Sequence, residues 1–356
     1  MKKITFFITK LGHGGAERVA TVLANYCVSL KDVQIDAVIT YDTESTYKLD
    51  EGITIYTLPY SKLSVLRKIR RMFEINSVLK KIEPDVVVSI PQGANAYIAI
   101  SKLINHSKYK IIFSQRSDPS CEYTTMFKQF FGYSVFKTAD IIVFQTEEAA
   151  NFFPNYLKKK GEIILNPISE DLPSHNIDDE NCDIVTFCRI EKVKNLQLLI
   201  RAFSKVHKIY PFLNLRVWGK GSQEDNLRKL IEELEMDNSI FLEGHTDRVH
   251  EMIKNAMIYV NSSDHEGVSN AMLESMCIGL PVICTDCPVG GARSIIDDHE
   301  NGILVPVNDE NGMISAILGL VENRDLREKL SSNAKKLKKK IAYPEIIKQW
   351  MNVIQQ

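Results

Sequence analysis

Several features are missing from this sequence, and each absence excludes a class of protein. No apolar run approaches the roughly 20 residues that span a bilayer as a helix, so we expect no integral membrane segment. Cysteine occurs only seven times, an odd number without regular spacing, which argues against a disulfide framework and fits a reducing compartment. Basic and acidic residues nearly cancel, at 44 and 45, so the net charge of -1 gives no whole-chain attraction to nucleic acid.

The amino-terminal stretch is too short in its apolar part for a signal peptide, and residues 4–9 fit a first strand instead. Cys284 and Cys287 have the spacing of a zinc-binding pair, but no second pair or nearby His pair completes such a site. We therefore expect a cytoplasmic protein. Peripheral attachment to the cytosolic face of the plasma membrane stays open.

The 356 residues exceed what one hydrophobic core usually supports, so two domains are expected. Short apolar segments alternate with helical patterns, which predicts parallel sheets covered by helices. The expected strands are residues 4–9, 34–40, 53–58, 85–90, 110–115, 140–145 and 162–165, followed by 184–188, 214–218, 240–243, 257–261, 281–284 and 302–305. This order predicts two doubly wound, Rossmann-like α/β domains facing each other across a cleft, with ligand at the carboxyl ends of the strands.

A polar segment at residues 168–182 is the best candidate for an interdomain linker. It separates an amino-terminal domain at residues 1–167 from a carboxyl-terminal domain at residues 183–342. Residues 343–356, which include Trp350, form a further helix candidate that could fold back onto the first domain.

Two carboxylates mark the most informative part of the chain. Glu274 is the only charged residue between Ala271 and Cys284, in a run that reads as a buried helix, and Glu266 stands eight residues before it. A buried carboxylate is costly unless it is paired, and a helix amino terminus attracts phosphate. The pattern therefore suits a ligand that carries both hydroxyl and phosphate groups. A solvated loop acid and a structural buried acid are the alternatives.

Two further segments favour phosphate binding. Arg189 and Lys194 follow an expected strand, where together they can neutralise a diphosphate. In the first domain, His13, Gly14 and Gly15 lie between the first strand and its helix, where glycine lets a ligand approach the backbone. This loop is not a dinucleotide fingerprint, because Glu17 stands where the third glycine is needed.

The ordered set of motifs resembles the retaining glycosyltransferases of family 4, which use the two-domain glycosyltransferase-B fold. Glu266 and Glu274 match the family's Glu-x7-Glu signature, and residues 285–293 and 301–307 continue the pattern. Arg189 and Lys194 match its Arg and Lys, although Cys188 stands where glycine is usual. The resemblance covers nearly the whole chain and is strongest at residues 189–307.

The resemblance implies that the domain at residues 1–167 binds the acceptor and that the domain at residues 183–342 binds the nucleotide-sugar. It also implies roles for the residues of the motifs. Glu274 would hold the ribose of a UDP-sugar, and Glu266 would face the donor sugar. Arg189 and Lys194 would stabilise the departing diphosphate, with Glu266 completing the catalytic set. The other donor-binding residues implied are Gly14, Gly15, Gly267, Val268, Ser269 and Asn270. The family tends to proceed by front-face attack, in which the leaving phosphate helps to deprotonate the acceptor.

The acceptor side is less defined. Many family members carry a His-Asp pair near Arg116 and Asp118, and this chain lacks that His. Acceptor contacts are therefore expected from His13, Arg116 and Asp118, without a catalytic base among them. The resemblance to bacterial enzymes of surface polysaccharide synthesis implies a glycan or polyprenyl-diphosphate-linked acceptor, with an N-acetylhexosamine as the expected sugar.

No Asp-x-Asp sequence occurs in the chain. Glycosyltransferases that bridge phosphate through a metal commonly use this motif, because paired carboxylates hold the cation. We therefore expect metal-independent transfer without a cofactor. A UDP-sugar 2-epimerase and a non-catalytic sugar-nucleotide-binding subunit are the alternative functions.

Residues 62–81 read as a basic amphipathic helix with one acid, Glu74. Its basic residues are Lys62, Arg67, Lys68, Arg70, Arg71, Lys80 and Lys81. The residues expected to face the core are Leu63, Leu66, Ile69, Phe73 and Val78. Such a helix fits an anionic membrane surface, with a merely solvated basic face as the alternative.

Overall fold

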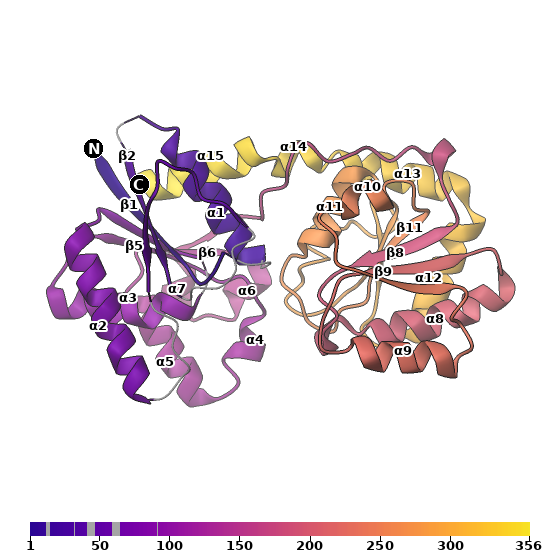
Figure 1. Cartoon of the computed structure of the whole chain (residues 1–356), viewed down its shortest axis with the longest axis horizontal. Helices are drawn as coiled ribbons and strands as arrows, with labels where there is room; N and C mark the ends of the chain where they lie inside the picture. Colours follow the sequence, from indigo (N-terminus) through magenta and orange to yellow (C-terminus); the bar gives the residue numbers. More distant parts are fainter. Residues whose placement is uncertain (12–14, 32, 41–46, 59–64, 91) are drawn as a thin grey trace. The chain divides into compact units, whose positions relative to one another are not determined.

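The structure is a computed structural model, and it describes residues 1–11, 15–31, 33–40, 47–58, 65–90 and 92–356 (Figure 1). The chain divides into two compact units. Unit 1 contains Met1–Asn166 and Ile346–Gln356, and unit 2 contains Pro167–Glu345. Each unit is a parallel sheet covered by helices, as the alternating sequence pattern predicts.

Unit 1 is built on a seven-stranded parallel sheet in the order β3-β2-β1-β4-β5-β6-β7. Its strands are β1 (Lys2–Ile8), β2 (Val33–Ile39), β3 (Thr54–Thr57), β4 (Val86–Ser89), β5 (Lys110–Ser114), β6 (Ile141–Phe144) and β7 (Gly161–Ile163). Its first helices are α1 (Gly15–Val28), α2 (Val65–Ile82) and α3 (Asn95–Asn105). They are followed by α4 (Pro119–Glu122), α5 (Met126–Lys137), α6 (Glu147–Asn151) and α7 (Asn155–Lys158).

The direction of the strand order decides which face each helix covers. The connection from β1 to β2 runs toward the β3 edge of the sheet. The connections from β3 to β4, from β4 to β5 and from β5 to β6 run toward the β7 edge. Because parallel crossovers are right-handed, α1 covers one face, and α2, α3 and α5 cover the opposite face. Figure 1 shows α2, α3 and α5 together on the far side of the sheet from α1.

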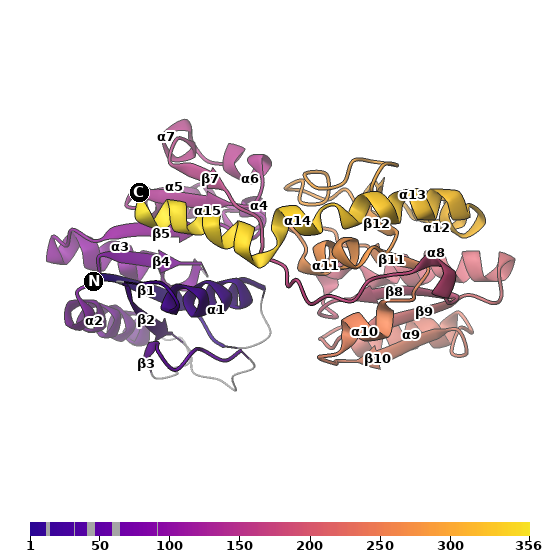
Figure 2. The ribbon, with the colours of Figure 1, turned by 90° about the horizontal axis from the view of Figure 1, so that it is seen from above.

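The carboxyl-terminal helix α15 (Tyr343–Gln355) occupies the α1 face of unit 1 (Figure 2). Cys27 of α1 lies 3.6 Å, sulfur to sulfur, from Met351, and Lys2 Nζ donates to the carbonyl of Ile354 at 3.0 Å. Trp350 is fully buried. The expected helix at residues 343–356 is therefore present, and its residues from Ile346 onward belong to unit 1.

The inward face of α2 differs from the sequence prediction. Ile75, Leu79 and Ile82 are buried, whereas Ile69 and Phe73 are 48% and 61% exposed. Phe73 lies two residues from Ile75, or about 200° around the helix, so the two point to nearly opposite sides. The prediction of a core-facing Ile69 and Phe73 was wrong, because apolar residues occur on both sides of this helix. Lys62 and Leu63 lie outside the described residues.

Unit 2 is built on a six-stranded parallel sheet in the order β10-β9-β8-β11-β12-β13. Its strands are β8 (Asp183–Phe187), β9 (Asn214–Trp218), β10 (Ile240–Gly244), β11 (Ile258–Asn261), β12 (Val282–Thr285) and β13 (Ile303–Val305). Its first helices are α8 (Leu196–Ile209), α9 (Glu224–Glu233), α10 (Val249–Ile253) and α11 (Asn270–Ile278). They are followed by α12 (Glu310–Glu322), α13 (Arg324–Lys335) and α14 (Lys338–Ile341).

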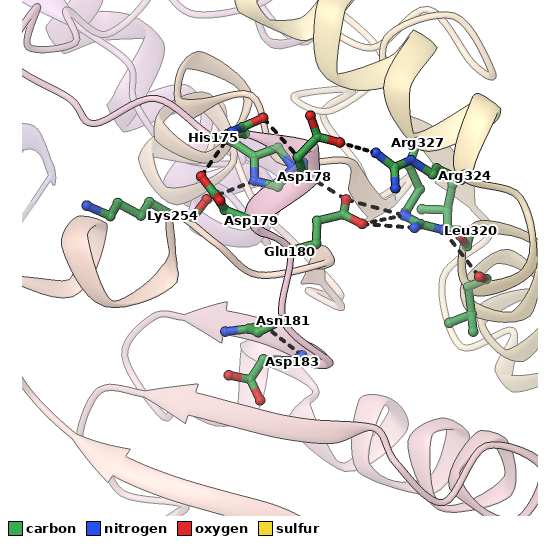
Figure 3. A network of polar contacts seen from close by, with 12 residues as sticks. His175, Asp178, Asp179, Glu180, Asn181, Asp183, Lys254, Leu320, Arg324 and Arg327 are labelled. Atoms are coloured by element: carbon green, nitrogen blue, oxygen red, sulfur yellow. Dashed lines mark hydrogen bonds and ion pairs between the residues drawn. The ribbon is translucent and has the colours of Figure 1, made fainter.

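The polar segment at residues 168–182, expected to be a linker, packs on unit 2 (Figure 3). The backbone N–H of His175 donates to Ile278 O at 2.8 Å, and its Nδ1 lies 2.8 Å from Lys254 O. Glu180 forms an ion pair with Arg327 of α13. Two acids that make this segment look like a solvated linker, Asp178 and Glu180, therefore have cationic partners on α13.

Two general expectations can be compared with the described residues. All seven cysteines are free thiols, as their irregular spacing indicates. Among the helices that the structure describes, none has the length and apolar character that crossing a membrane requires.

Candidate active site

The unit 2 residues predicted to bind the donor gather at the carboxyl edge of its sheet. Strand β8 leads into the loop that carries Arg189 and Lys194, and β11 leads into the loop that carries Glu266. Because β8 and β11 are adjacent and parallel, these two loops emerge side by side. Helix α11 starts at the end of the second loop, so its amino terminus lies at the same edge.

Glu266 and Lys194 form a close ion pair. The Nζ of Lys194 lies 2.6 Å from Oε1 and 2.7 Å from Oε2 of Glu266. The Lys194 side chain is 13% exposed and that of Glu266 is 21% exposed, so water screens the pair only in part. Ser263 Oγ also donates to Glu266 Oε2 at 2.9 Å, which fixes the carboxylate from a second side.

Backbone hydrogen bonds join the two loops. The N–H of Asp264 donates to Val193 O at 2.9 Å, and Ser262 Oγ donates to Lys194 O at 2.9 Å. Asn195 adopts the left-handed conformation, with φ 44°, and its side-chain amide donates to Asp264 Oδ1 at 2.7 Å. Lys194 and Glu266 are therefore held together by their loops as well as by charge.

Ser269 and the start of α11 complete this edge. Ser269 is the N-cap residue of α11, and its Oγ accepts a hydrogen bond from the N–H of Met272 at 3.4 Å. The helix begins where the sequence predicted. Ser269, Lys194 and Cys188 line one small pocket, together with Thr186, Leu196, Tyr259, Asn261 and Ser262. An anion in this pocket would meet both a lysine and a helix amino terminus.

Glu274 lies one turn further along α11 and is only 4% exposed. Its Oε2 is 2.9 Å from Nε2 of His250 on α10. The His250 ring in turn packs edge-on to Phe187, with ring centroids 5.8 Å apart. The buried carboxylate has the polar partner that its apolar surroundings require. Nothing in the sequence indicated His250, because it stands in a short helix without a motif.

Arg189 and Cys188 follow directly after β8. The side chain of Arg189 is exposed, and no hydrogen bond or ion pair of its guanidinium to the described residues is seen. Burial raises the pKa of the Cys188 thiol to about 11, so this thiol stays neutral at physiological pH. Arg189 is thus an exposed cation of the site, whereas Lys194 is held by its ion pair with Glu266.

Two of the residues predicted to touch the acceptor, Arg116 and Asp118, belong to unit 1. Arg116 Nη1 donates to Asn166 Oδ1 at 2.6 Å, and its guanidinium lies 5.5 Å from the Trp350 ring centroid. Burial lowers the pKa of Arg116. Asp118 caps α4 by accepting from the N–H of Ser120 at 2.8 Å. Both side chains therefore have packing roles within unit 1.

The glycine-rich loop is described only in part. Gly15 is the first residue of α1 and is exposed. His13 and Gly14 lie outside the described residues. The donor-binding prediction for Gly14 and Gly15 and the acceptor prediction for His13 therefore stay predictions.

Gly291 packs against the backbone of Gly267, the residue that follows Glu266. A Cβ at Gly291 would lie 1.8 Å from the carbonyl oxygen of Gly267, so Gly291→Ala must displace the backbone beside Glu266. We expect a loss of transfer activity on the order of 10²-fold, as for a misplacement of about 1 Å in a catalytic group. Steady-state kinetics on the purified variant would measure it.

The matched control is Gly319→Ala on α12, where an added Cβ has nothing within 4 Å. This variant should keep full activity and gain about 1 kcal/mol of stability, because alanine favours helix. Equal activity of the two variants would show that Gly291 does not hold the loop.

Comparisons with known proteins show which families and folds this chain resembles. Residues 167–337 match the sequence model of the family described as Glycosyl transferases group 1. An uncharacterized glycosyltransferase of Haemophilus influenzae is 25% identical over 99% of this chain and 100% of its own length. An N-acetylgalactosamine-N,N'-diacetylbacillosaminyl-diphospho-undecaprenol 4-alpha-N-acetylgalactosaminyltransferase of Campylobacter jejuni is 28% identical over 94% of both chains.

A solved structure shares the fold over the full length. HepE of Anabaena, in complex with UDP-glucose, superimposes with a TM-score of 0.84 over 100% of both chains at 16% sequence identity. The matched family region covers nearly all of unit 2, including Arg189, Lys194, Glu266 and Glu274. Residues 167–337 are therefore similar to the glycosyltransferase group 1 family, and the chain as a whole has the fold of the glycosyltransferase-B enzymes.

Proposed function

We propose that this chain is a retaining, metal-independent glycosyltransferase of family 4 that acts in bacterial surface polysaccharide synthesis. It would move a sugar, with an N-acetylhexosamine as the first candidate, from a UDP-sugar to a lipid-linked glycan at the cytosolic face of the membrane. The observation that carries this proposal is the Lys194–Glu266 ion pair beside the amino terminus of α11.

The cations would neutralise the departing diphosphate. Lys194 is fixed and mostly buried, so its charge is less screened than that of a surface lysine. Arg189 is exposed at the same edge and can fold over a phosphate with its planar guanidinium. The first-turn amides of α11, around Ser269 and Asn270, would add the positive end of the helix dipole.

The two carboxylates would contact the two sugars of the donor, the ribose and the transferred sugar. Glu274 lies about 6 Å along the α11 axis from Asn270, at a rise of ~1.5 Å per residue, which suits the step from diphosphate to ribose. His250 would keep the Glu274 carboxylate oriented toward the ribose hydroxyls. Glu266 would face the donor sugar and stabilise positive charge that develops at the anomeric carbon. The remaining donor contacts would come from Gly267 and Val268.

The relatives support the choice of donor and acceptor. The C. jejuni relative acts on a diphospho-undecaprenol substrate and forms an alpha linkage, and HepE binds UDP-glucose. An alpha product from an alpha-linked UDP-sugar retains the configuration of the anomeric carbon. A similar acceptor here would be a glycan carried on a polyprenyl diphosphate.

The test is release of UDP from a panel of UDP-sugars, with and without membrane lipid extract from a polysaccharide-producing bacterium. Release that requires both one sugar and the extract is expected, and it should continue unchanged in the presence of EDTA. Conversion of a UDP-sugar without any acceptor would instead indicate the 2-epimerase. Tight UDP binding without turnover of any sugar would indicate a non-catalytic binding subunit, and either result would overturn the proposal.

A further inference from the structure

Helix α5 of unit 1 exposes an unusual number of large apolar side chains. Met126 is 86% exposed, Phe127 78%, Phe130 74% and Phe131 51%. These four residues occupy positions one, two, five and six of the helix, so they share one side of it. A contiguous exposed patch of this kind marks an interaction surface, since isolated apolar residues are ordinary but clusters are not.

Helix α5 buries a different side against unit 1, so its exposed apolar residues are not the ones that form the core. The opposite side of α5 is packed on unit 1, where Phe136 is 1% exposed and lies 5.9 Å, centroid to centroid, from Phe113 of β5. The helix is also capped, because Thr125 Oγ1 accepts from the N–H of Lys128 at 3.2 Å. Helix α5 is therefore fixed to unit 1 by one face and presents the other, aromatic face outward.

The neighbouring helices continue this apolar character. Helix α3 packs against both α5 and α2, so the three helices form one layer over the same face of the sheet (Figure 1). Helix α2 exposes Ile69 and Phe73, and α3 exposes Leu103 and Ile104 by 64% and 58%. We call the outward side of α2, α3 and α5 the helical face of unit 1.

The charge of this layer is strongly one-sided. The sequences of α2, α3 and α5 contain nine basic residues and a single acidic one, although the whole chain carries a net charge of only -1. Lys68, Lys80 and Lys81 of α2 and Lys128 of α5 are exposed. The one acid, Glu74, is paired with Arg70 at 2.9 Å.

We propose that the helical face of unit 1 docks on an anionic lipid bilayer, with Met126, Phe127, Phe130 and Phe131 of α5 entering the headgroup region. Basic residues are attracted to anionic lipid, and aromatic residues favour the membrane–water interface. A second copy of the chain is a poorer occupant, because two such faces would bring like charges together. The inference deepens the proposed function, since a lipid-linked acceptor lies in the same membrane.

The experiment is co-sedimentation of the full chain with vesicles, measured without donor or acceptor so that it does not depend on transfer activity. The probes are phosphatidylcholine vesicles with and without phosphatidylglycerol. We expect binding that requires phosphatidylglycerol and falls as salt rises. Phe127→Ser with Phe130→Ser should weaken this binding at least tenfold, and Lys80→Ala with Lys81→Ala should make it less dependent on phosphatidylglycerol.

The matched control is Phe212→Ser in unit 2, where Phe212 is 55% exposed but lies outside the helical face. It should leave vesicle binding unchanged. Since all three aromatic residues are exposed, thermal unfolding should show that each variant keeps its fold. Unchanged binding of the Phe127/Phe130 variant would overturn the proposal. Loss of self-association instead of vesicle binding, measured by analytical ultracentrifugation, would assign the face to a second copy and would overturn it too.

Discussion

Glu266→Gln should lower kcat by about 10²- to 10³-fold, the loss typical of removing one electrostatic contact to a transition state. The substitution keeps the shape of the side chain but removes the charge that Lys194 binds through both carboxylate oxygens. It would also remove the carboxylate that we propose balances positive charge at the anomeric carbon. Release of UDP from the preferred donor, in the presence of acceptor, would measure the effect.

Lys194→Met tests the other half of the ion pair. It should also reduce kcat, because the departing diphosphate loses its fixed cation. If the two residues act as one unit, the fold-reduction in kcat of the double variant should be much smaller than the product of the two single reductions. Glu251→Gln is a suitable control, since Glu251 pairs with Lys254 in the same unit and both side chains are over 40% exposed. Full turnover by Glu266→Gln would contradict the role given to this pair.

Most of the unit 2 site could be predicted because its residues follow strand ends. The alternation of apolar segments predicts parallel strands, and parallel strands place their carboxyl ends at one edge. Glu266 and Lys194 stand 72 residues apart, yet their loops follow adjacent strands, β11 and β8. The start of α11 could be predicted for a different reason, since Ser269 is a strong N-cap residue before an apolar run.

Contacts made by residues without a motif could not be predicted. His250 contacts Glu274 only because α10 packs beside α11, which no local pattern indicates. The orientation of α2 was mispredicted because both of its sides carry apolar residues, and the exposed aromatic side of α5 was missed for the same reason. Segment 168–182 resembles a linker in composition, and only the fold shows that cations of unit 2 meet its acids.

Arg327→Met should destabilise unit 2 by about 3–5 kcal/mol, the usual cost of leaving a buried charge without its partner. Arg327 Nη2 lies 2.8 Å from Glu180 Oε2, and both side chains are only 8% exposed (Figure 3). Its Nη1 also donates to the carbonyl of Leu320 at 2.6 Å. The variant would remove the cation that balances the Glu180 carboxylate and the donor that this carbonyl accepts from. Urea unfolding at pH 7, followed by circular dichroism, would measure the loss.

The neighbouring pair provides the control, because it has the same chemistry without burial. Arg324 contacts Asp178 on the same two segments, but these side chains are 56% and 74% exposed. Arg324→Met should therefore cost less than about 1 kcal/mol. Equal losses from the two variants would mean that burial does not decide the strength of the Glu180–Arg327 contact.

The pH dependence of the free energy of unfolding gives an independent measure of the Glu180–Arg327 interaction. Burial alone would raise the pKa of Glu180, but hydrogen bonds from Arg327 and the nearby His175 ring outweigh burial and lower this pKa below 4.5. Because the folded-state pKa is the lower one, the contribution to stability is complete above pH 4.5 and is lost as the pH falls through the folded-state value. In Arg327→Met the carboxyl group loses this stabilisation, so its folded-state pKa should rise. The variant should then lose less stability than the wild type between neutral pH and pH 4. If stability changed with pH equally in both proteins, the acid sensitivity would arise elsewhere in the chain.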